Sequence, residues 1–150
     1  MAGVSGGSKL VARLRDVQRR LGGRLVVESG FLADKTYPTG EKVALIAALN
    51  EWGAPSHGQP PRPFFRNMIA KNSPQWSDQV RKVLAATDYD VRLTLERMGF
   101  LLDRQLVESI DALSSPPLAP ATIARKGFDK PLVDSGVMRN SVSHRVTEGT

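Results

Sequence analysis

Apolar residues recur at the spacing of an amphipathic helix near the start of the chain, over residues 9–21. Ser8 is a suitable N-cap for this helix, and Gly22 and Gly23 mark its end. Its apolar stripe consists of Leu10, Val11, Leu14, Val17 and Leu21. Arginines lie mostly off the stripe, so the outer side of the helix is basic. That side is either solvated or turned toward DNA or an acidic partner.

The same spacing predicts two helices in the middle of the chain. For residues 75–86, with Pro74 in the first turn, the stripe is Trp76, Val80, Val83 and Leu84. The longest predicted helix covers residues 89–113, with Thr87 or Asp88 as its cap, and its stripe is Val91, Leu95, Met98, Leu102, Leu106 and Ile110. Such stripes indicate packing against a core or a partner rather than a cofactor site.

Shorter patterns predict the remaining elements. Residues 24–32 are rich in β-formers and predict a strand with a bulge near Ser29 and Gly30. Residues 141–146 predict a final strand. Short helices are predicted over residues 41–52, 64–72 and 120–126. This mixture of elements predicts an α+β fold, with one domain over residues 9–150 after a flexible leader, residues 1–8.

A loop rich in proline and glycine follows the helix predicted over residues 41–52. Three prolines within four residues, Pro60, Pro61 and Pro63, predict a rigid loop. The loop ends in a basic and aromatic group, which consists of Arg62, Phe64, Phe65 and Arg66. It is therefore either a docking surface or a loop that the two phenylalanines hold against their own core.

Glu51, at the end of the preceding helix, also has two interpretations. With His57 on the loop it could form an acid–base pair. Alternatively, Asn50 and Glu51 bond to backbone N–H groups of the loop and hold the turn. We favour the second interpretation, because no other catalytic residue converges on this stretch.

The composition changes this picture in two ways. The net charge of +6 favours contact with nucleic acid or an acidic protein surface, although no zinc finger, RNA-recognition signature or basic zipper is present. The absence of cysteine excludes a disulfide scaffold, a thiol nucleophile and cysteine-based zinc sites. No apolar run approaches the ~20 residues of a membrane span. Residues 1–8 also lack the apolar segment of a signal peptide. We therefore expect a cytoplasmic protein with no membrane partner.

Motifs for catalysis and cofactor binding are absent from the sequence. It has no phosphate-binding loop, no GxGxxG and no GxSxG. His57 and His144 lie far apart and lack the spacing of metal ligands. Asp134, Ser135 and His144 could form a hydrolase triad, but Asp-Ser-Gly is short and common, and we interpret it as a turn. We expect no enzymatic activity, no cofactor and no metal.

Two blocks of sequence resemble a known protein family. The first, over residues 43–66, is VALIAALNEWG, a loop, and then PPRPFFR. The second, over residues 116–139, is PPLAPATIARK followed, after a short gap, by PLVDSGVMR. Both blocks, in this order and separated by a long helical segment, resemble the neck or tail-completion proteins of tailed bacteriophages. These proteins are also described as minor tail or virion morphogenesis proteins.

The resemblance implies a small antiparallel sheet packed against one long helix, and a structural role in the virion. Such proteins form a ring, expected here to be a hexamer, that joins the head–tail connector to the tail tube or terminator proteins. DNA would pass through the ring, so the expected location is the virion neck or tail, and the host cytoplasm during assembly. The chain ends soon after the second block, which leaves the length of the last strand open.

Two sets of residues are candidates for these contacts. The expected partner interface consists of Trp52, Pro61, Arg62, Pro63, Phe64, Phe65, Arg66, Leu118, Leu132 and Asp134. On the basis of charge alone, the candidates for facing DNA in the lumen are Arg13, Arg15, Arg19 and Arg20. The alternative is a basic accessory protein that binds nucleic acid through its helices, with an affinity that falls steeply with salt.

Overall fold

The computed structural model describes residues 7–32, 35–118, 120–127, 132 and 136–149. Its elements are the helices and strands α1 (Gly7–Leu21), β1 (Leu25–Gly30), α2 (Val43–Trp52), the 3₁₀ turn η1 (Pro55–His57), α3 (Phe64–Ala86), α4 (Val91–Ala112), α5 (Pro120–Lys126), α6 (Val137–Asn140) and β2 (Ser143–Glu148). The predicted α+β class and the antiparallel sheet beside a long helix are confirmed.

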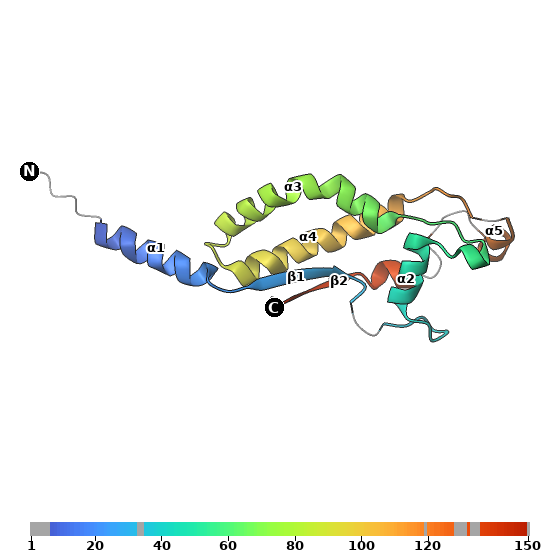
Figure 1. Cartoon of the computed structure of the whole chain (residues 1–150), viewed down its shortest axis with the longest axis horizontal. Coiled ribbons are helices and arrows are strands. Elements are labelled where there is room, and N and C mark those ends of the chain that lie inside the picture. The colour runs from blue at the N-terminus through green and yellow to red at the C-terminus, as the bar shows by residue number, and fades with distance from the viewer. Residues whose placement is uncertain (1–6, 33–34, 119, 128–131, 133–135, 150) are drawn as a thin grey trace, which may run out of the picture.

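The sheet joins the two ends of the chain (Figure 1). β1 and β2 are antiparallel, and their pairs run without interruption from Leu25 with Glu148 to Gly30 with Ser143. The predicted bulge is therefore wrong. Val26 breaks the apolar alternation because it lies on the outer face of the sheet, where it is 46% exposed, and not because the strand is irregular.

Three layers make up the long body of the molecule, with α4 between the sheet and α3 (Figure 1). α3 runs unbroken from residue 64 to 86, so the break predicted at Pro74 is wrong. Pro74 lies on the exposed side of α3, where a carbonyl that loses its N–H partner can bond to water instead. Met68 on one side of it is buried, and Trp76 on the other donates a 3.0 Å hydrogen bond to Gln105 of α4. Packing against α4 thus holds both halves of the helix in line.

The cap of α4 also differs from the prediction. Asp90 is the N-cap, and its carboxylate accepts a 2.9 Å hydrogen bond from the Leu93 N–H. Thr87 is buried, with its hydroxyl 2.7 Å from that of Thr94. Asp88 belongs to the tight turn between α3 and α4 and has a positive φ of 54°. The turn therefore uses the two residues that the sequence suggested as caps.

The hydrophobic core lies at one end of this body, between α2, α6 and the adjoining halves of α3 and α4. Its buried residues are Val43, Ala47, Phe64, Met68, Leu106, Ile110, Leu113 and Met138. α1 projects from the other end (Figure 1). Its helix is confirmed but begins at Gly7, so Ser8 lies inside it and is not its cap. No residue of α1 is buried.

Candidate partner-binding site

α2 separates the core from an apolar outer surface. Val43, Ala47 and Glu51, spaced by four residues, face inward and are buried. The other side of the helix is exposed and consists of Ala44, Leu45, Ala48, Leu49 and Trp52. A short helix that is apolar on both sides buries one side in its own core and leaves the other uncovered.

Glu51 closes the loop between α2 and α3. Its two carboxylate oxygens accept hydrogen bonds from the backbone N–H groups of Phe65 at 2.8 Å and of Arg66 at 3.2 Å. These groups lie in the first turn of α3, whose N-cap, Pro63, has no side-chain acceptor. A buried carboxylate at this position satisfies two N–H groups and complements the helix dipole. The predicted structural role of Glu51 is confirmed.

Asn50 supports the loop in a different way from the prediction. Its backbone carbonyl accepts a 2.7 Å hydrogen bond from the Arg62 N–H, while its side-chain oxygen accepts from the Gln59 side chain at 3.1 Å. Gly53 has a φ of 79°, and a Cβ there would lie 2.8 Å from both the Gln59 oxygen and the Pro61 nitrogen. The loop therefore folds back tightly on the end of α2, which requires glycine at this position.

The two phenylalanines of the loop end have different surroundings. Phe64 is 1% exposed and its ring lies edge-on to those of Phe31 and Phe65, at centroid distances of 6.0 and 6.4 Å. Phe64 belongs to the core, so in the single chain it is not on a surface that a partner could reach. Phe65 is half-buried. Of the two interpretations of the loop, core attachment thus applies to Phe64.

Trp52 and Arg66 form the exposed part of this site. Trp52 is 65% exposed, and the Arg66 guanidinium lies 4.3 Å from the centre of its ring. The Arg66 Nε also donates to Glu51 at 2.7 Å. Arg66 therefore contacts both the exposed indole ring and the buried carboxylate of Glu51.

Arg62 is buried and lines a cavity of about 600 Å³. Its Nη2 donates a 3.4 Å hydrogen bond to the Pro117 carbonyl, and its Nε has no hydrogen-bond partner among the described residues. Burial lowers the pKa of the Arg62 guanidinium from its ordinary value. Like Phe64, Arg62 is not an exposed contact residue in the single chain.

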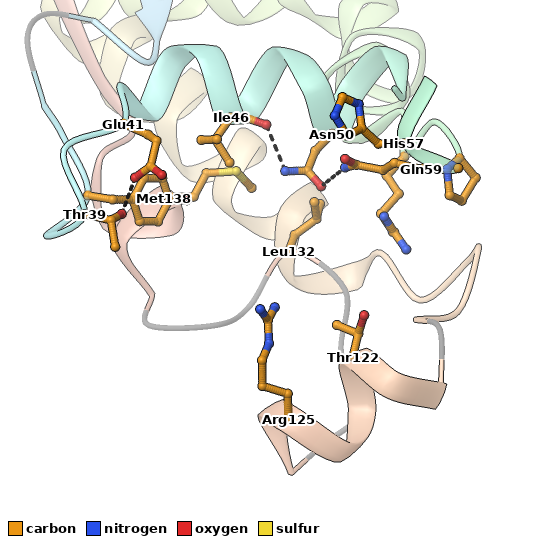
Figure 2. Close-up of a pocket in the computed structure, with 14 residues that line it drawn as sticks. Thr39, Glu41, Ile46, Asn50, His57, Gln59, Thr122, Arg125, Leu132 and Met138 are labelled. Atoms are coloured by element: carbon orange, nitrogen blue, oxygen red, sulfur yellow. Dashed lines mark hydrogen bonds between the residues drawn. The ribbon is translucent and has the colours of Figure 1, made fainter. Parts of the chain in front are cut away.

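The same cavity joins the two sequence blocks. Figure 2 shows Thr122 and Arg125 of α5 across the cavity from Asn50 and Gln59, with Leu132 between them. Met138 of α6 lines it as well. Residues more than fifty positions apart in the sequence thus form one surface.

The other predicted interface residues have varied environments. Pro61 is exposed, whereas Pro63, Leu118 and Leu132 are half-buried. Asp134 lies outside the described residues, as does Ser135 of the hydrolase triad that the sequence suggested.

The candidate arginines of α1 divide into two groups. Arg13 and Arg20 both form ion pairs with Asp88 in the turn between α3 and α4. The hydrogen bond from Arg13, with its charge, lowers the pKa of Asp88, and the pKa of Arg13 is raised in turn. Arg19 pairs only with Asp16 of the same helix, and Arg15 forms no ion pair with any described residue. Arg13 and Arg20 thus orient α1, whereas Arg15 and Arg19 face solvent.

A polar cluster between the sheet and α4 was missed by the sequence analysis. His144 of β2 is 2.6 Å from Asp103 and 3.4 Å from Glu96, and its ring lies over Gly99. The Ser29 hydroxyl donates a 2.7 Å hydrogen bond to Asp103 and not to His144, so the cluster lacks the order of a nucleophilic triad. It connects β1, β2 and α4. The spacing of Glu96, Gly99 and Asp103 places them on one side of α4, but no local pattern signals their partners Ser29 and His144, which come from distant strands.

In the described part of the chain, no group of three or more His, Cys, Asp or Glu residues could hold a metal ion. Within the same residues, no helix is long and apolar enough to span a membrane. Comparison of the chain with protein-family models, curated proteins and solved structures gives no match.

Proposed function

We propose that the protein is a structural component of a tailed-phage virion, which forms a ring at the head–tail junction and completes the neck or tail. Its partners are further copies of itself, the head–tail connector and the tail tube or terminator proteins. DNA passes through the ring without sequence-specific contact. The protein has no catalytic role.

The convergence of the two resembling blocks carries this proposal. Residues 43–66 and 116–139 carry the resemblance, and members of both blocks line the 600 Å³ cavity at one end of the molecule. A motif that serves one function is expected to form one surface. The resemblance would carry less weight if the blocks lay at opposite ends of the chain.

The apolar surface around α2 also supports an assembled protein. Leu45 is 55% exposed and Trp52 65%, and both lie on one side of the same short helix. Contiguous exposed apolar surface of this kind is typical of sites that another protein covers.

Light scattering on the purified chain tests the proposal, over a range of concentrations and with or without DNA. A ring-sized species in the absence of DNA is the expected result, and electron microscopy should show a central hole. The same preparation should join purified capsids to tails in vitro. A protein that forms no ring alone or on capsids, and that does not promote joining, would refute the proposal.

The exposed Arg15 and Arg19 favour a second candidate, a basic accessory protein that binds nucleic acid. This candidate predicts that the isolated chain binds DNA with an affinity that falls steeply as salt increases. Replacing both residues with glutamine should then weaken binding, whereas Arg81→Gln, an exposed control on α3, should have a smaller effect. DNA binding by a protein that stays monomeric would favour this candidate over the ring.

A further inference from the structure

Two apolar surfaces that no other described part of the chain covers lie at opposite ends of the molecule. One is the stripe of α1, and the other is a groove between α2 and α3. The helices α1 and α2 themselves lie at opposite ends in Figure 1. β1 separates the two surfaces. α1 ends before the first residue of β1, and Phe31, which lines the groove, follows the last residue of β1. In this structure α1 points away from the body, and no residue of α1 lines the groove of its own chain (Figure 1).

The stripe of α1 has the spacing of a helix that packs against another helix. Leu10, Leu14, Val17 and Leu21 follow one another at intervals of four, three and four residues. Leu10 is 60% and Leu14 58% exposed, and the helix contacts the body mainly through the ion pairs of its arginines with Asp88. An isolated helix of this length is only marginally stable in water, so a cover over the stripe would stabilise it.

The groove has the shape and chemistry to receive such a stripe. It is a cavity of about 350 Å³, lined mainly by apolar side chains that include Phe31, Ala44, Ala48, Trp52, Phe65 and Ile69. Ala44 and Ala48 are exposed and one turn apart on α2. Small residues on one face of a helix allow the side chains of a second helix to pack closely against it. Trp52, whose ring is in contact with Arg66, forms one wall.

We propose that α1 of one copy docks in the α2–α3 groove of the next copy, with its leucines against Ala44, Ala48 and Ile69. This inference rests on the self-assembly in the proposed function and specifies its interface. The contact is head-to-tail, because it joins different surfaces of two identical chains. Contacts of this type close into rings when the rotation between subunits allows it.

The area available is sufficient for a specific contact. Six large apolar side chains of the two surfaces remain about one-third to two-thirds exposed: Leu10, Val11, Leu14, Leu21, Trp52 and Ile69. Covering them removes on the order of 600 Å² of apolar surface, which is the apolar share of an interface of about 1,000 Å². That total is the minimum expected of a specific protein–protein interface.

The charges around both surfaces predict the response to salt. α1 carries Arg15 and Arg19, whereas the arginine that lines the groove, Arg66, is paired with Glu51. The contact is therefore formed by apolar side chains and not by opposite charges, so salt has no attraction to screen. Assembly should therefore be as tight or tighter at high salt, which is the opposite of the response expected for DNA binding.

Mixing two variants tests the head-to-tail contact directly. The double variant Leu10→Gln/Leu14→Gln should block the helix, and Ala48→Glu should block the groove. All three sites are exposed, so both variants should fold, which circular dichroism and unfolding curves check. Each variant alone should be monomeric by light scattering. Mixed, they should form a one-to-one dimer, because the intact α1 of one fits the intact groove of the other.

Matched controls and a cross-link complete the test. Arg15→Gln on α1 and Ala85→Glu, at the far end of α3, are exposed changes that should leave assembly intact. The chain has no cysteine, so introduced thiols report only their own contacts. Leu14→Cys mixed with Ala48→Cys should form an interchain disulfide under mild oxidation, whereas Leu14→Cys with Ala85→Cys should not.

Three outcomes would overturn the proposal. Ala48→Glu could assemble like the unaltered chain while only the α1 variant loses assembly. That result would show that α1 pairs with something other than the groove. Unchanged assembly of both variants would place the interface elsewhere. An unaltered chain that stays monomeric at high concentration, and gives no disulfide between positions 14 and 48, would exclude the contact. In each case joining of capsids to tails tests the proposed function independently.

Discussion

α1 and α2 are both short helices with apolar stripes, but the fold uses them differently. The buried stripe of α2 packs into the core through Val43 and Ala47, and Glu51 at its end caps α3. α1 buries no residue and is attached through Arg13 and Arg20 to Asp88. The difference shows that an apolar stripe identifies a helix face that packs against another surface. It does not indicate whether that surface belongs to the same chain.

The largest expected contrast in stability comes from replacing a leucine with alanine at each end of the molecule. Leu106→Ala, in the core at 0% exposure, should lower the free energy of unfolding by ~2–5 kcal/mol, because it leaves a cavity. Leu14→Ala, at 58% exposure, should change it by less than ~0.5 kcal/mol in the monomer. Urea unfolding of dilute protein measures both. A similar loss for Leu14→Ala would mean that α1 packs on its own chain.

Loss of the cap that Glu51 supplies should have the next largest effect on stability. Glu51→Ala leaves the N–H groups of Phe65 and Arg66 without their acceptor in a partly buried position, at a cost of about 1–3 kcal/mol. Asp90→Ala, which removes an exposed cap of α4, should cost ~1 kcal/mol. Thermal and urea unfolding compare the two variants. A smaller loss for Glu51→Ala than for Asp90→Ala would contradict its role as the buried link between α2 and α3.

Two helical glycines give a similar contrast. A Cβ at Gly99 would lie 2.2 Å from the His144 ring, whereas a Cβ at Gly7 meets nothing within 4 Å. Gly99→Ala should therefore destabilise the protein by ~1–3 kcal/mol, because the sheet must move off α4. Gly7→Ala should leave stability unchanged or slightly higher, since alanine favours helix. The amide chemical shifts of β2 should change in the first variant only.

The smallest effect is expected for the contact that orients α1. The lowered pKa of Asp88 means that its contribution is complete above the carboxyl's unfolded pKa of about 4 and is lost as pH falls through the lower folded value. Hydrogen exchange in α1 should accelerate in Asp88→Asn and in acid, with little change in global unfolding. Asp78→Asn, which removes an exposed pair within α3, is the control. Equal protection of α1 in Asp88→Asn would show that the ion pairs do not hold it.

Much of the secondary structure could be predicted because its signals are local. The 3.6-residue period identifies α1 and α4 from the spacing of their leucines, and the prolines after residue 114 mark the end of the long helix. The wrong predictions rest on local signals, which tertiary packing overrides. Pro74 would end a helix in isolation, but α3 continues because both of its halves pack on α4.

The candidate site could be predicted in part. The loop and the role of Glu51 follow from residue types near one another in sequence, and hydrogen bonds confirm that Glu51 holds the turn. The exposure of Arg62 and Phe64 could not be judged, because an arginine or phenylalanine beside a loop fits both a surface and a core. Only the position of α4 and of the second block decides that both are buried.

The sequence by itself therefore determined most of the helices, their apolar faces, the strands and the α+β class, since these depend on backbone preferences and spacing between near neighbours. It did not predict α6 or the continuity of α3. Tertiary structure alone decided which faces are covered. It also decided that β1 pairs with β2 across the length of the chain and that His144 packs on Gly99. These depend on how distant segments bury surface and satisfy polar groups together, which no local pattern specifies.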